Sequence, residues 1–391
     1  MGALYGAFFY LFKVSTMSNK ELPKGSLISF MSNKVKLQGG INLAQGIPAF
    51  DPPKELIDIL RLVANDNIHQ YAPGRGVYAL LEQLAKYYKL PQQQFIMVNG
   101  ATEAISLLFI YLQNLIKEKF SVLAFDPVYE SYHNLARIFN LPFVAYPNEP
   151  VIDFSKIEED IKSKNVRIIL LASPGNPLGK VYSRHEIESL TELSLKHQVY
   201  LIFDAVYSEL YFDVKPYLPT DKINPYLFYV NAFSKQFSIT GWRLGYLIAD
   251  ASHMDALAHV HDYTGLCAPS LLQTALAAYL DKYSFGRDYT EDLRDKLKGN
   301  YNQLKDALNE LGFSVVPAQG GYFVWAMLPP AFTDGFDFAM ALYDEQKVAT
   351  IPGIHFSEQG KNFVRFNIAR HPYEISMAIS KIKTFIKGKM A

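Results

Sequence analysis

The chain has 391 residues, and its 38 lysines and arginines balance 38 aspartates and glutamates, so the formal net charge is zero. Charges of both signs are interspersed, which argues against a nucleic-acid-binding surface or a polybasic membrane patch. The single cysteine, Cys267, excludes an intramolecular disulfide and favours a reducing, cytoplasmic location.

Residues 3–12 form an apolar and aromatic stretch that is too short to span a bilayer. The stretch also lacks the basic start and the cleavage site of a signal peptide. We therefore expect residues 1–16 to be an N-terminal extension, either from an upstream start or as an arm packed on the body.

Between about residues 51 and 250, helical patterns alternate with short apolar segments that predict strands. This alternation predicts a mostly parallel sheet with helices on both faces, whose ligand site lies beyond the carboxyl ends of the strands. The predicted strands are residues 95–98, 122–125, 168–172, 201–203, 227–230 and 246–248.

The pattern changes from about residue 289, and the rest of the chain predicts a smaller α+β lobe. A long amphipathic helix is expected over 290–311, and a final helix over 373–387 begins close to Pro372, a residue favoured at helix starts. The strands expected in this lobe are residues 313–316, 321–326 and 363–368.

Lys235 follows the predicted strand 227–230 and is therefore expected among apolar atoms. Burial lowers the pKa of a lysine, and a neutral amine can form a Schiff base with an aldehyde cofactor. Arg243 is a fixed cation suited to bidentate phosphate binding. A Schiff-base lysine beside a phosphate-binding arginine is what pyridoxal phosphate (PLP) requires. The pair alone would be interpreted as ordinary surface residues, and the other motifs of the chain reverse that interpretation.

Two further strand ends carry residues that suit such a cofactor. Residues 100–104 (GATEA) open a helix, whose free N–H groups can bind phosphate; the alternative is a plain turn capped by Thr102. Asp204 ends a buried strand and needs a cationic partner, for which a protonated pyridine nitrogen would serve. The alternative for Asp204 is a helix cap or a salt bridge.

Turns after the remaining strands present an aromatic ring and an amide. Residues 125–129 (FDPVY) place Tyr129 where it can stack on a planar ring, or simply pack in the turn. Residues 173–179 (SPGNPLG) form a tight turn that presents the Asn176 amide, a donor for a phenolate oxygen or a carboxylate. In residues 363–367, alternation places Arg365 on the face opposite Val364 and Phe366.

These motifs, in this order from about residue 41 to residue 367, resemble the class I and II aminotransferases of the fold-type I PLP enzymes. The match is densest over residues 232–245 (AFSKQFSITGWRLG), where it departs at Ala232, a position that usually carries Ser or Gly. An alanine cannot donate a hydrogen bond to the cofactor phosphate, so that contact is missing. Segments such as INLAQG, QYAP and NPLGKV most resemble the kynurenine, glutamine and methionine aminotransferases.

The resemblance implies an α/β fold with a large domain, a mostly parallel seven-stranded sheet flanked by helices, and a smaller α+β domain. The implied domains are residues 49–285 for the large PLP-binding domain and residues 17–48 with 286–391 for the small domain.

The resemblance also implies roles for individual residues. Lys235 would hold PLP and act as general acid–base, Asp204 would pair with the ring nitrogen, and Tyr207 would donate to the ring oxygen. Tyr71 would reach the phosphate of the neighbouring subunit, so the protein would be a homodimer with shared active sites. The other implied cofactor-binding residues are Ala101, Thr102, Tyr129, Asn176, Ser234 and Arg243, and the implied substrate-binding residues are Gly46, Asn176 and Arg365, which the R-x-N spacing favours over Arg370.

The implied reaction moves an amino group from a neutral or aromatic L-amino acid to a 2-oxo acid. Residues 263–273 contain no lysine or arginine that could bind a second carboxylate, although Arg75 lies on a loop that could cross a dimer. Alternatives are an aspartate-type aminotransferase and a carbon–sulfur β-lyase on the same fold. A PLP-fold regulator is disfavoured, because too few residues precede Ile41 for a DNA-binding domain. His253, His259 and His261 are expected to be surface histidines, and no metal site is predicted.

Overall fold

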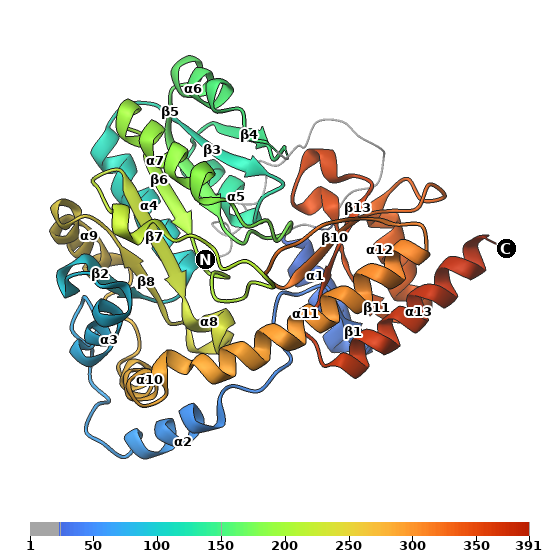
Figure 1. Ribbon diagram of the computed structural model, residues 1–391, viewed down its shortest axis with the longest axis horizontal. Coiled ribbons are helices and arrows are strands. Elements are labelled where there is room, and N and C mark those ends of the chain that lie inside the picture. The colour runs from blue at the N-terminus through green and yellow to red at the C-terminus, as the bar shows by residue number, and fades with distance from the viewer. Residues whose placement is uncertain (1–22, 24, 150, 391) are drawn as a thin grey trace, which may run out of the picture.

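The computed structural model describes residues 23, 25–149 and 151–390, so the predicted extension over residues 1–16 lies outside the described residues. The chain forms a large lobe and a small lobe that lie side by side (Figure 1). Each lobe is built on its own sheet, and we keep residues 49–285 and 286–391 as the proposed limits of the two main domains.

The large lobe contains a seven-stranded sheet in the order β2-β8-β7-β6-β5-β3-β4. Neighbouring strands are parallel except at β8, which is antiparallel to β2 and β7. The mostly parallel sheet is confirmed, and the predicted strands end within two residues of those observed. The strands are β2 (Phe95–Val98), β3 (Ser121–Asp126), β4 (Phe143–Pro147), β5 (Val166–Ala172), β6 (Tyr200–Asp204), β7 (Leu227–Ala232) and β8 (Gly245–Ile248).

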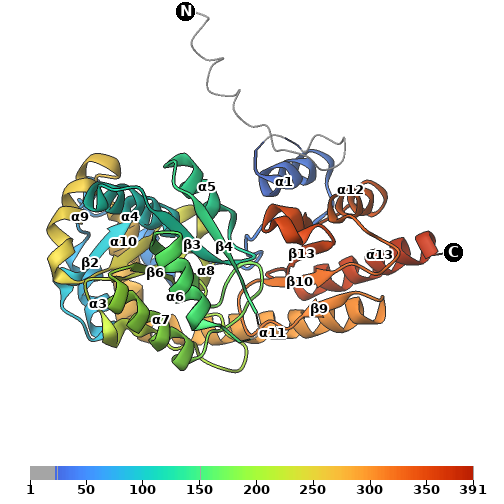
Figure 2. The ribbon, with the colours of Figure 1, turned by 90° about the horizontal axis from the view of Figure 1, so that it is seen from above.

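Sequence reasoning missed β4, which pairs only with β3 at the edge of the sheet. Four of its five residues are partly or fully exposed, so the continuous apolar signal of a central strand is absent. The central strands are buried on both faces because helices cover the sheet on both sides (Figure 2).

The two faces of the sheet have separate cores. One is shared with α4 (Ala101–Ile116), α5 (Glu130–Ile138) and α9 (Ala251–Thr264). Along β2, Ile96 and Val98 belong to this core, while Phe95 and Met97 belong to the opposite one, as the two-residue period of a strand requires. The opposite core is shared with α2 (Lys54–Val63), α3 (Tyr78–Tyr88), α6 (Phe154–Ser163), α7 (Arg184–His197) and α10 (Ser270–Lys282).

The small lobe contains a four-stranded antiparallel sheet in the order β12-β13-β10-β9 and a two-stranded parallel pair, β1 with β11. Helix α11 (Arg287–Glu310) runs from the large lobe along the small one (Figure 1). The other elements of this lobe are α1 (Leu27–Gln38), β1 (Ile41–Asn42), β9 (Ser314–Val316), β10 (Phe323–Met327), α12 (Gly335–Gln346), β11 (Val348–Ala349), β12 (Ile351–Pro352), β13 (Phe363–Asn367) and α13 (Pro372–Met390).

Short helical turns join these elements, and one of them, α8 (Phe233–Gln236), follows β7 directly. The 3₁₀ turns are Gln92–Gln94, Pro219–Lys222, Thr240–Trp242, Ser284–Gly286, Gly353–His355 and Glu358–Gly360. Within the described part of the chain, no helix is both long and apolar enough to cross a membrane.

Two of the three histidines expected at the surface are buried, so that prediction is wrong for them. His253 donates through Nε2 to the carbonyl oxygen of Pro225 (2.7 Å), and its Nδ1 lies 2.7 Å from the Tyr111 hydroxyl. His261 is fully buried beside Glu103. Both face α4, against which α9 packs, whereas His259 is exposed. Among the described residues, no group of three or more potential ligands could hold a metal ion.

Candidate active site

A cavity of about 340 Å³ lies between the lobes, at the carboxyl ends of the large sheet's strands. Most of the residues singled out from the sequence line this one cavity, although the motifs that contain them lie far apart along the chain. They are Gly46, Ala101, Thr102, Tyr129, Asn176, Asp204, Tyr207, Ser234, Lys235, Arg243 and Arg365.

Lys235 lies in α8, the single helical turn that begins where β7 ends. Its Nζ donates a hydrogen bond to the carbonyl oxygen of Gly46 (2.6 Å), and the Tyr322 hydroxyl donates to the Lys235 carbonyl oxygen (2.6 Å). Burial, together with the nearby cations Arg365 and Arg243, lowers the pKa of Lys235 to about 8. A neutral amine, which is the nucleophilic form, is therefore accessible near neutral pH.

Asp204 is the last residue of β6, and only 4% of it is exposed. Its carboxylate accepts hydrogen bonds from the Tyr132 hydroxyl (2.7 Å) and from the backbone N–H of Val206 (3.1 Å). Burial raises the pKa of Asp204. Within the described chain no cation pairs with this carboxylate, so a cationic group in the cavity would provide the missing partner.

Tyr132 was missed by sequence reasoning, although its position was readable. It lies in the first turn of α5, three residues after the N-cap residue Tyr129, so the two side chains are expected to lie near each other. Their rings meet edge to face, with centroids 5.9 Å apart. Tyr132 thus holds the Asp204 carboxylate through its hydroxyl and contacts the Tyr129 ring through its own ring.

The end of the cavity near Arg243 is suited to an anion. Gly100 (φ 89°) is the N-cap of α4, which places free N–H groups of the helix toward Arg243, and Thr102 does not cap the helix. Arg243 Nη2 donates to the carbonyl oxygen of Asn99 (3.0 Å). A Cβ atom at Gly100 would lie 2.5 Å from that nitrogen, so a side chain there would displace the guanidinium.

These residues fit PLP. Ser234 Oγ lines the cavity and is a buried hydroxyl without a hydrogen-bond partner among the described residues, as a group awaiting a ligand would be. The helix N-terminus, Arg243 and Ser234 suit the phosphate, Asp204 suits a ring N–H, and Lys235 suits an aldehyde.

Arg365 forms the opposite wall, and only 1% of it is exposed. Its Nη1 donates to Asn176 Oδ1 (2.8 Å) and its Nη2 to the Ala44 carbonyl oxygen (2.5 Å), while the guanidinium lies 4.0 Å from the ring centre of Phe323. Burial lowers the pKa of Arg365 to about 10, so it stays charged at neutral pH. Arg370, the alternative, pairs with Glu374 and does not line the cavity.

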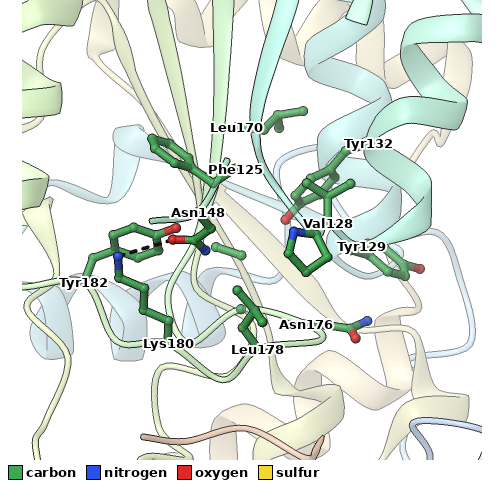
Figure 3. A pocket seen from close by; sticks show the side chains of 13 residues that line it. Phe125, Val128, Tyr129, Tyr132, Asn148, Leu170, Asn176, Leu178, Lys180 and Tyr182 are labelled. Atoms are coloured by element: carbon green, nitrogen blue, oxygen red, sulfur yellow. Dashed lines mark hydrogen bonds between the residues drawn. The ribbon is translucent and has the colours of Figure 1, made fainter. Parts of the chain in front are cut away.

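Gly46 closes the cavity beside Lys235 and has no room for a side chain. A Cβ atom there would lie 2.7 Å from Cζ of Phe323. Figure 3 shows a small neighbouring pocket that shares Tyr129, Tyr132 and Asn176 with the cavity. These shared side chains form the boundary between the two spaces.

Tyr71 and Arg75 do not line the cavity. Tyr71 is 82% exposed, whereas Arg75 bonds within its own chain, to Asp255 (2.5 Å) and to the Gln93 carbonyl oxygen (3.3 Å). Arg75 is therefore engaged by its own chain, and the exposed Tyr71 side chain stays a predicted contact to a second subunit.

Glu130 is a second residue that sequence reasoning missed. It lines the cavity from the first turn of α5 and contacts Ser26 and His355 of the small lobe. Its position directly after Tyr129 could have indicated this, because consecutive residues at the start of a helix can line the same cavity. The contacts across the lobes were not readable from the sequence.

Residues 38–382 match the protein family described as aminotransferase class I and II. A "probable aspartate aminotransferase" from Methanocaldococcus jannaschii is 30% identical over 361 residues, covering 88% of this chain and 92% of the relative. Aromatic-amino-acid aminotransferase 2 from Thermococcus litoralis is 25% identical over 90% of this chain and 93% of its own length.

The fold is also similar to that of solved aminotransferases. N-succinyldiaminopimelate aminotransferase from Mycobacterium tuberculosis superposes with a TM-score of 0.85 at 25% identity, covering 95% of this chain and all of that one. The family match spans both lobes and the whole cavity. The chain therefore belongs to the class I and II aminotransferases and is a PLP-dependent aminotransferase.

Proposed function

We propose that the enzyme moves the amino group of a neutral or aromatic L-amino acid, of the methionine, glutamine, kynurenine or aromatic type, to a 2-oxo acid. The proposal rests on the basic residues that line the cavity. Lys235, Arg243 and Arg365 are the basic residues among its described lining. Each has a role toward the cofactor or the α-carboxylate, so none remains to pair with a second carboxylate.

The proposed roles of the residues follow from their chemistry. PLP, when bound, supplies an aldehyde and an electron-withdrawing ring. Asp204 would provide a negative charge for the cofactor's ring nitrogen at the buried end of the cavity, and the Tyr207 hydroxyl would donate to the cofactor's ring oxygen. Arg365 and Asn176 bind the α-carboxylate of the amino acid, which orients its α-hydrogen toward Lys235. The Lys235 amine then removes that proton as a general base and, as a general acid, passes it on to the cofactor instead of giving it back to the α-carbon.

An aspartate-type aminotransferase is the second candidate, because the Methanocaldococcus jannaschii relative bears that name. The other named relative acts on aromatic amino acids by its name, which supports the first candidate. A carbon–sulfur β-lyase is not favoured, because the relatives named above are aminotransferases.

A panel of amino donors separates the two candidates. Each donor is mixed with the PLP-loaded enzyme, and conversion of the cofactor to its amine form is followed by absorbance. We expect methionine, glutamine and aromatic amino acids to exceed aspartate in kcat/KM. Aspartate as the best donor would overturn the proposal in favour of the second candidate.

We also propose that the active form is a homodimer in which Tyr71 reaches the phosphate site of the other subunit. The support is an aromatic side chain that is almost fully exposed in one chain and that belongs to the QYAP motif. Tyr71→Phe should weaken PLP binding about tenfold, the loss of one charge-assisted hydrogen bond. Sedimentation at assay concentration tests the assembly, and a fully active monomer would contradict it.

A further inference from the structure

Glu130 places a carboxylate in the cavity that the reaction as described does not use. Of the described residues lining the cavity, the acidic ones are Asp204 and Glu130. Asp204 lies at the buried end and is held by Tyr132 and Val206. Glu130 lies at the start of α5, on the side where the small lobe meets the large one.

The Glu130 carboxylate is held in place and ionised. The Ser26 hydroxyl lies 3.0 Å from each of its oxygens, and His355 Nε2 lies 2.6 Å from Oε2. Burial by itself would raise the pKa of Glu130, but His355, Ser26 and Arg365 outweigh it and the pKa lies below its ordinary value. Glu130 is therefore ionised at neutral pH and lines the cavity, whereas its partner His355 does not line it.

The proposed binding of the amino acid determines which walls its side chain meets. When the α-carboxylate binds Arg365 and the amine points to Lys235, the side chain of the amino acid must face the other walls of the cavity. Side chains that remain on the α1 and α5 side of the cavity include Ile28, Ile47 and Glu130. Two apolar side chains and one carboxylate suit an apolar or amide side chain, and they oppose a second negative charge.

We propose that Glu130 is a specificity-determining residue, which excludes amino acids with a side-chain carboxylate from this aminotransferase. This inference rests on the proposed preference for neutral donors and names a residue that enforces it. A carboxylate brought next to Glu130 loses its hydration and gains like-charge repulsion instead of a partner. The corresponding amide has the same shape without the charge, and its N–H groups can donate to Glu130.

A second interpretation is that Glu130 only holds the two lobes together, and the chain offers a control for it. Asp126, at the other end of the same turn, accepts a hydrogen bond from the Ser357 hydroxyl of the small lobe. Asp126 therefore makes the same kind of contact between the lobes, but it does not line the cavity. Neutralising either carboxylate weakens a contact between the lobes, but only neutralising Glu130 removes a charge from the lining of the cavity.

The test compares Glu130→Gln and Asp126→Asn with the native PLP-loaded enzyme, using two pairs of donors that differ only by charge. These are glutamate with glutamine, and aspartate with asparagine. We expect Glu130→Gln to raise the ratio of kcat/KM for the acid to that for the amide about tenfold. Asp126→Asn should leave both ratios within about twofold. Unchanged ratios in Glu130→Gln, or an equal rise in Asp126→Asn, would overturn the proposal.

A binding measurement without turnover completes the test. Glutarate has the two carboxylates of glutamate but no amine, and calorimetry gives its dissociation constant directly. We expect it to bind about tenfold more tightly to Glu130→Gln than to the native enzyme or to Asp126→Asn, and equal affinities would contradict the role of Glu130. If the native enzyme itself prefers aspartate or glutamate, the proposed donor class fails instead, which the donor panel detects independently of either variant.

Discussion

The two ends of the cavity are built in different ways. The cofactor end, around Lys235, Asp204 and Gly100, comes from the carboxyl ends of three strands of one sheet, β7, β6 and β2. The substrate end, around Arg365 and Glu130, is assembled from both lobes. The backbone positions of the first are set by one sheet, whereas the geometry of the second depends on how the lobes meet.

This difference suggests that the two ends of the cavity have different functions. Changes at the cofactor end should alter the reaction with every donor, because each donor meets the same sheet-borne groups. Changes at the substrate end should alter binding and the choice of donor, because those contacts form between the lobes.

Lys235→Ala should abolish transamination for all donors while still allowing PLP to bind noncovalently. Loss of general acid–base catalysis alone costs about 10²–10⁴-fold in rate, and loss of covalent attachment adds to it. Turnover is measured together with the PLP content of the purified protein. In the native enzyme, borohydride reduction followed by peptide mapping should place the pyridoxyl label on Lys235, and a label on another lysine would refute the assignment.

Asp204→Asn should keep the shape of the site and lower kcat for all donors alike. The substitution removes a buried negative charge, and the barrier should rise by about 3 kcal/mol if the electrostatic contribution has its usual size. Kinetics with two chemically different donors, alongside PLP binding, measure the effect. Near-normal turnover with PLP bound would show that Asp204 has no role toward the ring nitrogen.

Arg365→Lys should chiefly raise KM, in contrast to the two changes above. Lysine keeps the charge but cannot reproduce the paired contacts that Arg365 makes with Asn176 and Ala44. We expect KM for the amino donor to rise about tenfold or more, the loss of one hydrogen bond to a charged group. A loss of kcat with unchanged KM would place Arg365 at the cofactor end instead.

Covalent attachment of PLP to the PLP-free protein should depend on pH through Lys235. Because the pKa of Lys235 lies at about 8, the protonated, unreactive form predominates below that pH. The rate should rise about tenfold per pH unit up to about pH 8 and then level off, as measured by absorbance after mixing. An ordinary lysine would show the same rise continuing to above pH 10.

Much of the cofactor end was readable from the sequence, because its residues follow short apolar segments that predict strands. Asp204 and Lys235 each end a strand or follow one directly, and parallel strands bring their carboxyl ends to one edge. The substrate end was readable only in part. Alternation oriented Arg365 correctly, away from the core that holds Val364 and Phe366, but Glu130 was not recognised as part of the cavity.

The mistaken histidines have the same physical origin. His253 and His261 are polar residues in an exposed-looking segment, and only the packing of α9 on α4 buries them. Local pattern determines which side of a strand or helix a residue occupies, but it does not say which surfaces will later be covered.

The sequence motifs carried the resemblance to the family, and local periodicity with turns at strand ends predicted the parallel sheet. The same motifs led to the proposed roles of the lysine, aspartate and arginine in PLP chemistry. Tyr132 reaches Asp204, and Glu130 contacts Ser26 and His355, only through the packing of the folded chain. Those contacts join residues 72 to 225 positions apart, since they form only when α5 packs on the sheet and the lobes come together. No local pattern encodes that approach.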